Sequence, residues 1–169
     1  DFTDAAGNNG VQIATAVTSG SNVTFDGTAA TINPVAISSD NTFTHFAKEG
    51  DLMTLTFTAN EDIDTRQLPT VSIAGALPSS GAGNSASVTR TSASGGSWVY
   101  SATYTMGGGT TTDEEGTVQF VLAYEDIAGN AGTNVVAITT GSNVTYDKTA
   151  PYTGDATYPY TINCTQAGT

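Results

Sequence analysis

Residues 53–59 read MTLTFTA, an unbroken alternation of apolar and hydroxyl side chains that decides the fold class. Successive side chains of a β-strand point to opposite faces of its sheet, so this alternation predicts a strand with one buried face. The same period of two recurs at residues 71–73, 98–106, 118–124, 136–138 and 144–146. With a first strand around 32–37 and a weaker one at 85–91, the sequence predicts about seven strands.

The composition agrees with this all-β interpretation. Of the 169 residues, 38% are hydrophobic, only 12% are charged and 19 are glycine. Glycine-rich stretches at 75–83 and 107–109 are typical of the turns that join short strands. Short antiparallel strands at this spacing predict a β-sandwich of the immunoglobulin type. No apolar run approaches the roughly 18 residues that a membrane-spanning helix needs, so no membrane insertion is expected.

The charge balance is strongly acidic. Sixteen Asp and Glu residues against four Lys and Arg give a formal net charge of -12. Nucleic acid is excluded as a partner, because binding it requires clustered basic side chains. An acidic surface attracts hard cations, with calcium foremost. The alternative is that the charge serves only to keep the protein soluble.

The sequence offers little for catalysis. It contains one histidine, His45, and one cysteine, Cys164, and neither lies in the sequence context of a known nucleophile or its base. We expect His45 to be a loop residue and Trp98 to anchor the core rather than to stack on a sugar. The acidic residues 113–115 follow a Gly/Thr-rich turn and are expected to form a solvated loop rather than an acid/base pair. We therefore expect no enzymatic activity.

Two motifs occur twice and define the domain organisation. DAAGN at 4–8 returns as DIAGN at 126–130, and GSNVTFD at 20–26 returns as GSNVTYD at 141–147. A Thr-Ala pair follows the last Asp in both copies. Such self-similarity predicts a tandem array. Residues 1–26 are then the C-terminal strand and tail of a preceding repeat, 27–147 a complete repeat, and 148–169 the linker and first strand of a following repeat.

The sequence resembles the bacterial Ig-like repeats (Big-type, cadherin-like) of large extracellular surface and adhesion proteins. The matching segments are residues 50–59, 69–75, 97–106, 115–116, 126–133 and 144–151. The resemblance implies an extracellular or cell-surface location and a place in a filament, appendage or adhesin stalk. The second interpretation is a module that binds carbohydrate or a cell surface through loop aromatics. Most aromatics fall on the expected buried faces, which favours the structural role.

Clustered acids predict inter-repeat calcium at the two poles of the sandwich. Alternate loops of an antiparallel sandwich lie at opposite ends, so Asp26, Glu61, Asp62 and Asp126 are expected at one pole and Asp147 at the other. Calcium takes 6–8 oxygen ligands, which such a cluster can begin to supply. The alternative is that these acids only cap turns and close tight hairpin loops.

Partners other than calcium are glycans and copies of the same unit. Asn22, Asn143 and Asn163 each begin an Asn-x-Ser/Thr motif, which predicts covalent N-linked glycans. Residues 11–25 form an apolar strand without neighbours of its own, so we expect it to add to a sheet of another copy. Repeated head to tail, this contact gives a polymer, whether or not the copies are covalently continuous.

Overall fold

The alternating stretch at 53–59 forms the second strand of a sheet, as its pattern predicts. The computed structural model describes residues 3–10, 20, 23–63, 68–76, 83–94, 97–109 and 112–151, and these residues form strands, turns and loops without a helix. The strands are β1 (Ile32–Ser39), β2 (Phe46–Ala47), β3 (Leu52–Ala59), β4 (Thr70–Ala76), β5 (Asn84–Ser85), β6 (Ser87–Ser94), β7 (Ser97–Thr105), β8 (Glu114–Ala123) and β9 (Thr145–Tyr146). The prediction of an all-β chain is therefore confirmed.

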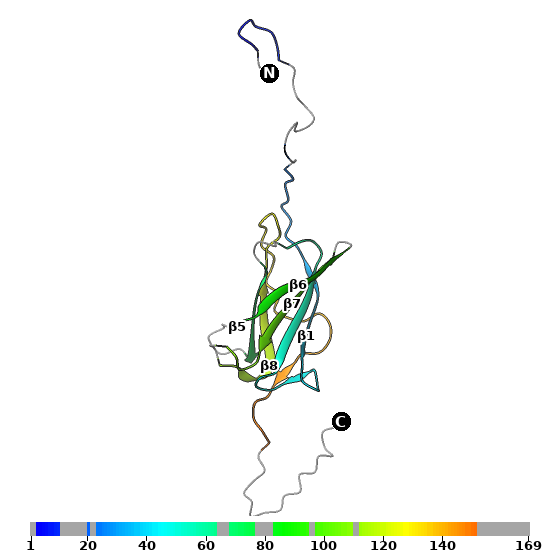
Figure 1. The fold of residues 1–169 in the computed structure, drawn as a ribbon, viewed down its shortest axis with the longest axis vertical. Coiled ribbons are helices and arrows are strands. Elements are labelled where there is room, and N and C mark those ends of the chain that lie inside the picture. The colour runs from blue at the N-terminus through cyan, green and yellow to red at the C-terminus, as the bar shows by residue number, and fades with distance from the viewer. Residues whose placement is uncertain are drawn as a thin grey trace, which may run out of the picture.

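Two sheets face each other (Figure 1). One has the strand order β1-β3-β7-β6 and is antiparallel throughout. The other has the order β2-β9-β8-β4-β5 and is antiparallel except for the short parallel pair of β2 with β9. The strands thus form a sandwich-like arrangement. They outnumber the predicted strands because β2 was not predicted and the strand expected at 85–91 is divided into β5 and β6.

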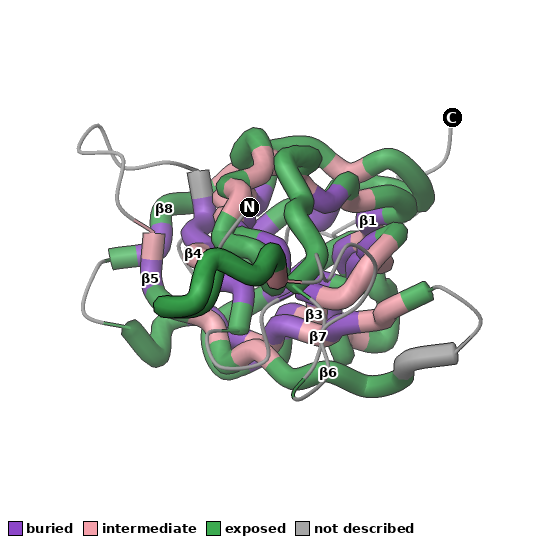
Figure 2. The backbone as a smooth tube through the Cα atoms, turned by 90° about the horizontal axis from the view of Figure 1, so that it is seen from above, coloured by how far each residue is buried: buried purple, intermediate pink, exposed green. Residues whose placement is uncertain are grey.

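The core fills the space between the sheets. Buried residues gather along the inner faces and exposed ones lie outside (Figure 2). In β3 the apolar positions of the alternation are all buried, and the ring of Phe57 stacks on Tyr100 of β7 with centroids 5.3 Å apart. Burying such side chains is the main term that stabilises the fold. The largest of them are Tyr100, Tyr146, Phe57, Met53 and Leu55.

The strand expected at 136–138 is wrong. Val136 is 59% exposed, and it is Val135 that pairs with Leu122, through two hydrogen bonds of 2.9 Å. The cause is a crossing of the chain toward the other sheet: Val35 donates its N–H to the hydroxyl of Thr139 (2.9 Å) and accepts from the Thr139 N–H (2.9 Å). A shift by one residue reverses the face that each side chain presents.

The described chain enters and leaves the sandwich at opposite ends (Figure 1). We call the end that carries residues 23–31 the N-terminal pole; β3 and β8 end there. The end that carries residues 147–151 is the C-terminal pole, where β1 and β7 end. Most of the strand predicted at 11–25 lies outside the described residues, and Val23 and Phe25 are almost fully exposed.

Candidate functional site

Three acids meet at the N-terminal pole. Asp26 precedes β1, Glu61 follows β3, and Asp126 follows β8, so three separate segments deliver them to one place. Their carboxylate oxygens lie within 4.8 Å of one another, and in the part of the chain that the structure describes no other three acid, histidine or cysteine side chains form such a group. The sequence predicted these three residues together at this pole.

The hairpin loop 126–130 fixes the carboxylate of Asp126. Asn130 donates its backbone N–H to one carboxylate oxygen (2.9 Å) and its side-chain amide to the other (2.8 Å). These bonds, the side-chain bond foremost, hold the pKa of Asp126 below its usual value. Gly129, at a φ of 90°, permits the tight reversal. Asp126 is thus buried and ionised, and both of its carboxylate oxygens accept hydrogen bonds from within its own loop.

The surroundings of Glu61 make ionisation of its carboxyl group unfavourable. Burial raises its pKa, and the negative charges of Asp26 and Asp126 raise it further. The cluster therefore concentrates negative charge that a cation or a proton would relieve.

The two other predicted metal ligands lie apart from this group. Asp62 forms an ion pair with Arg90 of β6, with 2.9 Å between nitrogen and oxygen. Asp147 lies at the C-terminal pole, where its carboxylate accepts the N–H of Thr149 (2.9 Å). Asp26 accepts the N–H of Thr28 in the same way (3.0 Å). The turn-capping interpretation therefore describes the local structure of both repeated Asp residues.

The two copies of the DxAGN motif have the same local structure. Asp4 accepts the backbone N–H of Asn8 (2.9 Å) and its side-chain amide (2.9 Å), as Asp126 does from Asn130. The turn glycine, Gly7, has a φ of 89°, against 90° in the other copy. A β-bridge closes each loop at its base. Residues 3–9 thus have the same local fold as residues 125–131.

The expectation that residues 113–115 form a solvated loop is wrong: Glu114 and Glu115 are exposed but begin strand β8, and Asp113 is buried. This side chain is only 3% exposed and lies inside the C-terminal pole. Its carboxylate is the shared acceptor of four donors: Tyr104 Oη (2.7 Å), Gly107 N (2.8 Å), Gly75 N (3.1 Å) and Asn84 Nδ2 (3.5 Å). Burial, together with the bond to Asp113, raises the pKa of Tyr104 far above its ordinary value. Burying a polar group costs free energy unless it is hydrogen-bonded, and these donors supply the hydrogen bonds that Asp113 needs.

Glu115 holds the segment that leaves this pole. It accepts hydrogen bonds from the backbone N–H of Lys148 (3.0 Å) and from the hydroxyl of Thr149. The Lys148 ammonium reaches back to the carbonyl of Asp113 (3.1 Å). The bond from Thr149, followed by those from the backbone, lowers the pKa of Glu115.

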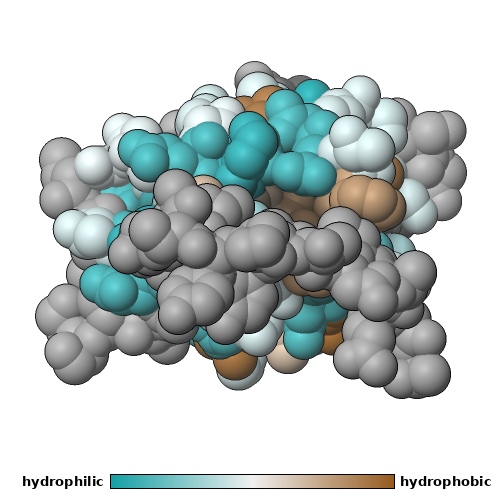
Figure 3. Space-filling view, turned by 90° about the horizontal axis from the view of Figure 1, so that it is seen from below, coloured by the Kyte–Doolittle hydropathy of each residue, from teal (hydrophilic) through white to brown (hydrophobic). Residues whose placement is uncertain are grey.

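An exposed group of rings also lies near the C-terminal pole. His45 is a loop residue, as predicted, and its ring is 4.6 Å from that of Phe46 and 6.5 Å from that of Phe43. Phe43 is 65% exposed. From below, the described surface is mainly hydrophilic with small hydrophobic areas (Figure 3). Trp98 is half-buried and packs against the core cluster.

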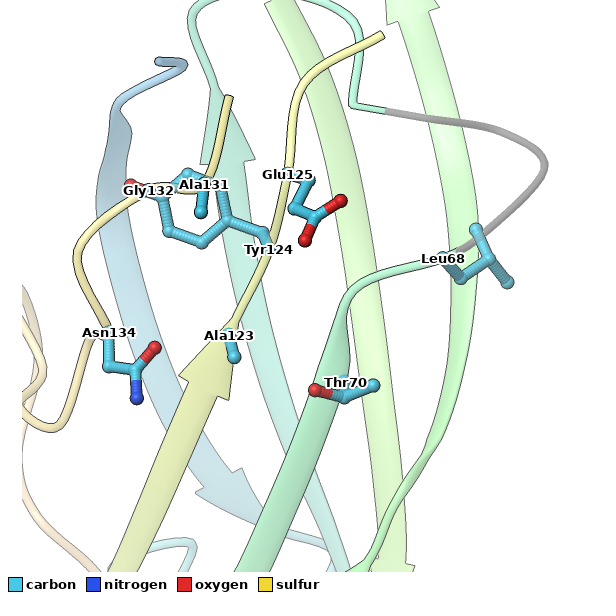
Figure 4. Close-up of a pocket in the computed structure, with 8 residues that line it drawn as sticks. All are labelled: Leu68, Thr70, Ala123, Tyr124, Glu125, Ala131, Gly132 and Asn134. Atoms are coloured by element: carbon cyan, nitrogen blue, oxygen red, sulfur yellow. The ribbon is translucent and has the colours of Figure 1, made fainter. Parts of the chain in front are cut away.

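A shallow hollow lies beside β4 and β8 near the N-terminal pole (Figure 4). Its volume is about 220 Å³, below the 300 Å³ at which small-molecule pockets begin. Glu125 points across it, whereas Asn134 points away. The ring of Tyr124 lies flat against Gly132, where an added Cβ would come within 2.2 Å of it.

Of the three predicted glycosylation sites, one can be placed. Asn143 is exposed, and Thr145 of the same motif is exposed on β9. Asn22 and Asn163 lie outside the described residues, as does Cys164. Asn143 is therefore accessible for modification.

Comparison with family models, with curated proteins and with solved structures finds no match. Among the described residues there is also no helix of the length and apolarity that crossing a membrane requires.

Proposed function

We propose that the protein is a non-enzymatic structural repeat of an extracellular filament, appendage or adhesin stalk, arranged head to tail. The observation that carries this proposal is the placement of one repeated turn at both poles. The turn at Asp26 leads into the sandwich at one end, and its copy at Asp147 leads out at the other. A unit built in this way can join its copies head to tail, and such contacts give an open filament when the rotation between copies does not close a ring.

The strand order supports an immunoglobulin-like unit. Immunoglobulin sandwiches of the constant type have strands A, B, E and D in one sheet and C, F and G in the other. Here β1, β3, β7 and β6 take the first set of positions, and β4, β8 and β9 take the second. Folds of this kind serve as spacers, stalks and binding domains alike, so the fold alone does not select among them.

The second candidate is a module that binds carbohydrate or a cell surface. The exposed rings of Phe43, His45 and Phe46 favour it, because aromatic faces can stack on sugars. Two hollows near the C-terminal pole are lined by other residues: one by Asn84, Tyr104 and their neighbours, the other by Glu49, Asp113 and Lys148. We therefore place this function second.

Labelling of the source cells tests the structural role. An antibody raised against the full chain, with a gold conjugate and electron microscopy of unpermeabilised cells, should mark surface appendages in regular rows. Label found only inside broken cells would contradict the proposal. Binding of the purified chain to a defined glycan, lost when Phe43 and Phe46 are changed to serine, would favour the second candidate.

Calcium at the junction between copies remains a prediction. The three acids of the N-terminal pole would provide at least three of the 6–8 oxygens that the ion takes. They are also close enough to the incoming segment for a bound ion to stiffen it.

A further inference from the structure

Three side chains hold the incoming segment, residues 26–31, at the N-terminal pole. They are Asn60 after β3, and Tyr124 and Asn130 after β8. The hydrogen bonds run from Asn130 Nδ2 to Asp26 O (3.2 Å), from Tyr124 Oη to Ala30 O (3.2 Å), from Thr31 N to Asn60 Oδ1 (2.7 Å) and from Asn60 N to Thr31 O (3.1 Å). The segment is thus bound along its second half and through its first carbonyl.

A different set of groups holds the outgoing segment, residues 147–149, at the C-terminal pole. Glu115 is the central residue, with help from β2 and from the backbone of Asp113. The hydrogen bonds run from Asp147 N to Ala47 O (2.9 Å), from Lys148 N to Glu115 Oε1 (3.0 Å), from Lys148 Nζ to Asp113 O (3.1 Å) and from Thr149 Oγ1 to Glu115 Oε1. At this pole the backbone N–H groups of the first two residues, Asp147 and Lys148, donate the hydrogen bonds.

Residues 26–29 and 147–150 are two copies of one motif, Asp-x-Thr-Ala, folded into the same turn. The two poles take different backbone groups of this motif. The C-terminal pole accepts the N–H groups of its first two residues, and the N-terminal pole binds the carbonyl of its first residue and the groups that follow the motif. Because the two sets do not overlap, one copy of the motif can make both at once.

We propose that the Asp-x-Thr-Ala segment is a shared connector that fixes successive units in one orientation. The preceding unit holds its start through the residue at the position of Glu115. The following unit holds its end through the residues at the positions of Asn60, Tyr124 and Asn130. This inference rests on the proposed function, since it requires units in line. Relative motion is the usual behaviour of joined domains, so a fixed junction is a specific claim.

The residue that follows the second copy of the motif, Pro151, is also compatible with this role. Pro151 stands where Ala30 stands in the first copy. The bond at this position uses the carbonyl, which accepts from Tyr124. Proline lacks the N–H but keeps the carbonyl, so the same bond remains available.

The test is the full chain with residues 27–147 repeated once, directly after Asp147. We expect ¹⁵N relaxation to give one common, anisotropic tumbling for the two copies, as for a single rigid rod. Glu115→Ala in the first copy should release them to tumble separately. Glu114→Ala is the matched control, because it removes a neighbouring, exposed acid of the same charge. Separate tumbling without any substitution, or unchanged tumbling in Glu115→Ala, would overturn the proposal.

Hydrogen exchange in the 169-residue chain, without the added repeat, gives a second measurement. Glu115→Ala should speed exchange of the Lys148 amide about tenfold, and Glu114→Ala should leave it unchanged. Equal rates in the two variants would overturn the connector even if the lengthened chain did not fold. Both measurements use purified protein, so they are independent of where the array lies. If the junction proved rigid but the antibody did not label the cell surface, only the proposed extracellular location would be rejected.

Discussion

Replacing Asp113 with alanine should be among the most destabilising single changes in this protein. The carboxylate is 3% exposed, and its removal leaves the O–H of Tyr104 and the N–H groups of Gly75 and Gly107 without their acceptor. An unsatisfied buried donor costs about 1–3 kcal/mol. Water that enters the vacated space would satisfy part of the set. We therefore expect a loss of about 3–5 kcal/mol, a large part of the 5–15 kcal/mol that domains typically have.

The assay is urea unfolding followed by the fluorescence of Trp98, the single tryptophan. Tyr104→Phe should cost less, about 1–2 kcal/mol, because Asp113 keeps the two backbone donors. Glu114→Ala changes an exposed acid next in sequence and should stay within about 0.5 kcal/mol. If Asp113→Ala cost no more than Glu114→Ala, the buried hydrogen bonds would not be what holds the C-terminal pole together.

Three further predictions concern the N-terminal pole and the β4–β8 pair. The pKa of Glu61 is raised above 4.5, so the folded state binds more protons than the unfolded state just above that pH, and stability falls as pH rises through this window. Glu61→Gln should remove that fall and gain less than about 1 kcal/mol at pH 7, measured by urea unfolding; a loss at pH 7 would contradict the repulsion. If calcium binds the acid cluster, an excess of 100 times its Kd should stabilise the chain by about 2.7 kcal/mol over EGTA, and Glu61→Gln should weaken this gain. Identical melting curves with calcium and with EGTA would reject the site. Gly75→Ala should cost about 2 kcal/mol or more, because its Cβ would lie 1.9 Å from the carbonyl oxygen of Glu114; an unchanged urea midpoint would show that the strands shift freely.

Local pattern predicted most of the fold. A strand with one buried face alternates at every residue, so the inner faces of β3, β7 and β8 could be read directly from the sequence. The acid cluster could be predicted because loops alternate between the poles of an antiparallel sandwich. That rule needs only the order of the strands, and it brought Asp26, Glu61 and Asp126 together.

What could not be predicted depends on contacts between distant residues. Asp113 looks solvated in a Gly/Thr-rich turn, yet Gly75, which precedes it by 38 residues, supplies one of its donors. Asp62 pairs with Arg90, 28 residues away, so its membership of the acid cluster could not be judged from its loop alone. Val136 is exposed because the chain beyond it bonds to Val35 of the other sheet. The local periodicity of the sequence does not indicate any of these partners.

The two equivalent Asp residues, Asp26 and Asp147, have different surroundings at the two poles. This difference determines how an array would respond to pH and to cations. At the C-terminal pole the carboxylate of Asp147 caps its turn beside Lys148, with no group of three acids around it among the described residues. At the N-terminal pole the equivalent Asp26 caps the same turn but lies against Glu61 and Asp126. A junction that joins both poles therefore combines a connector whose hydrogen bonds favour a fixed geometry with a cluster whose charges oppose it. Protons or cations would reduce only the opposing interaction, since the hydrogen bonds of the connector use mainly backbone groups that do not titrate. Acid or a divalent ion should thus tighten the junction until the pH falls far enough to protonate Glu115, whose lowered pKa delays that loss.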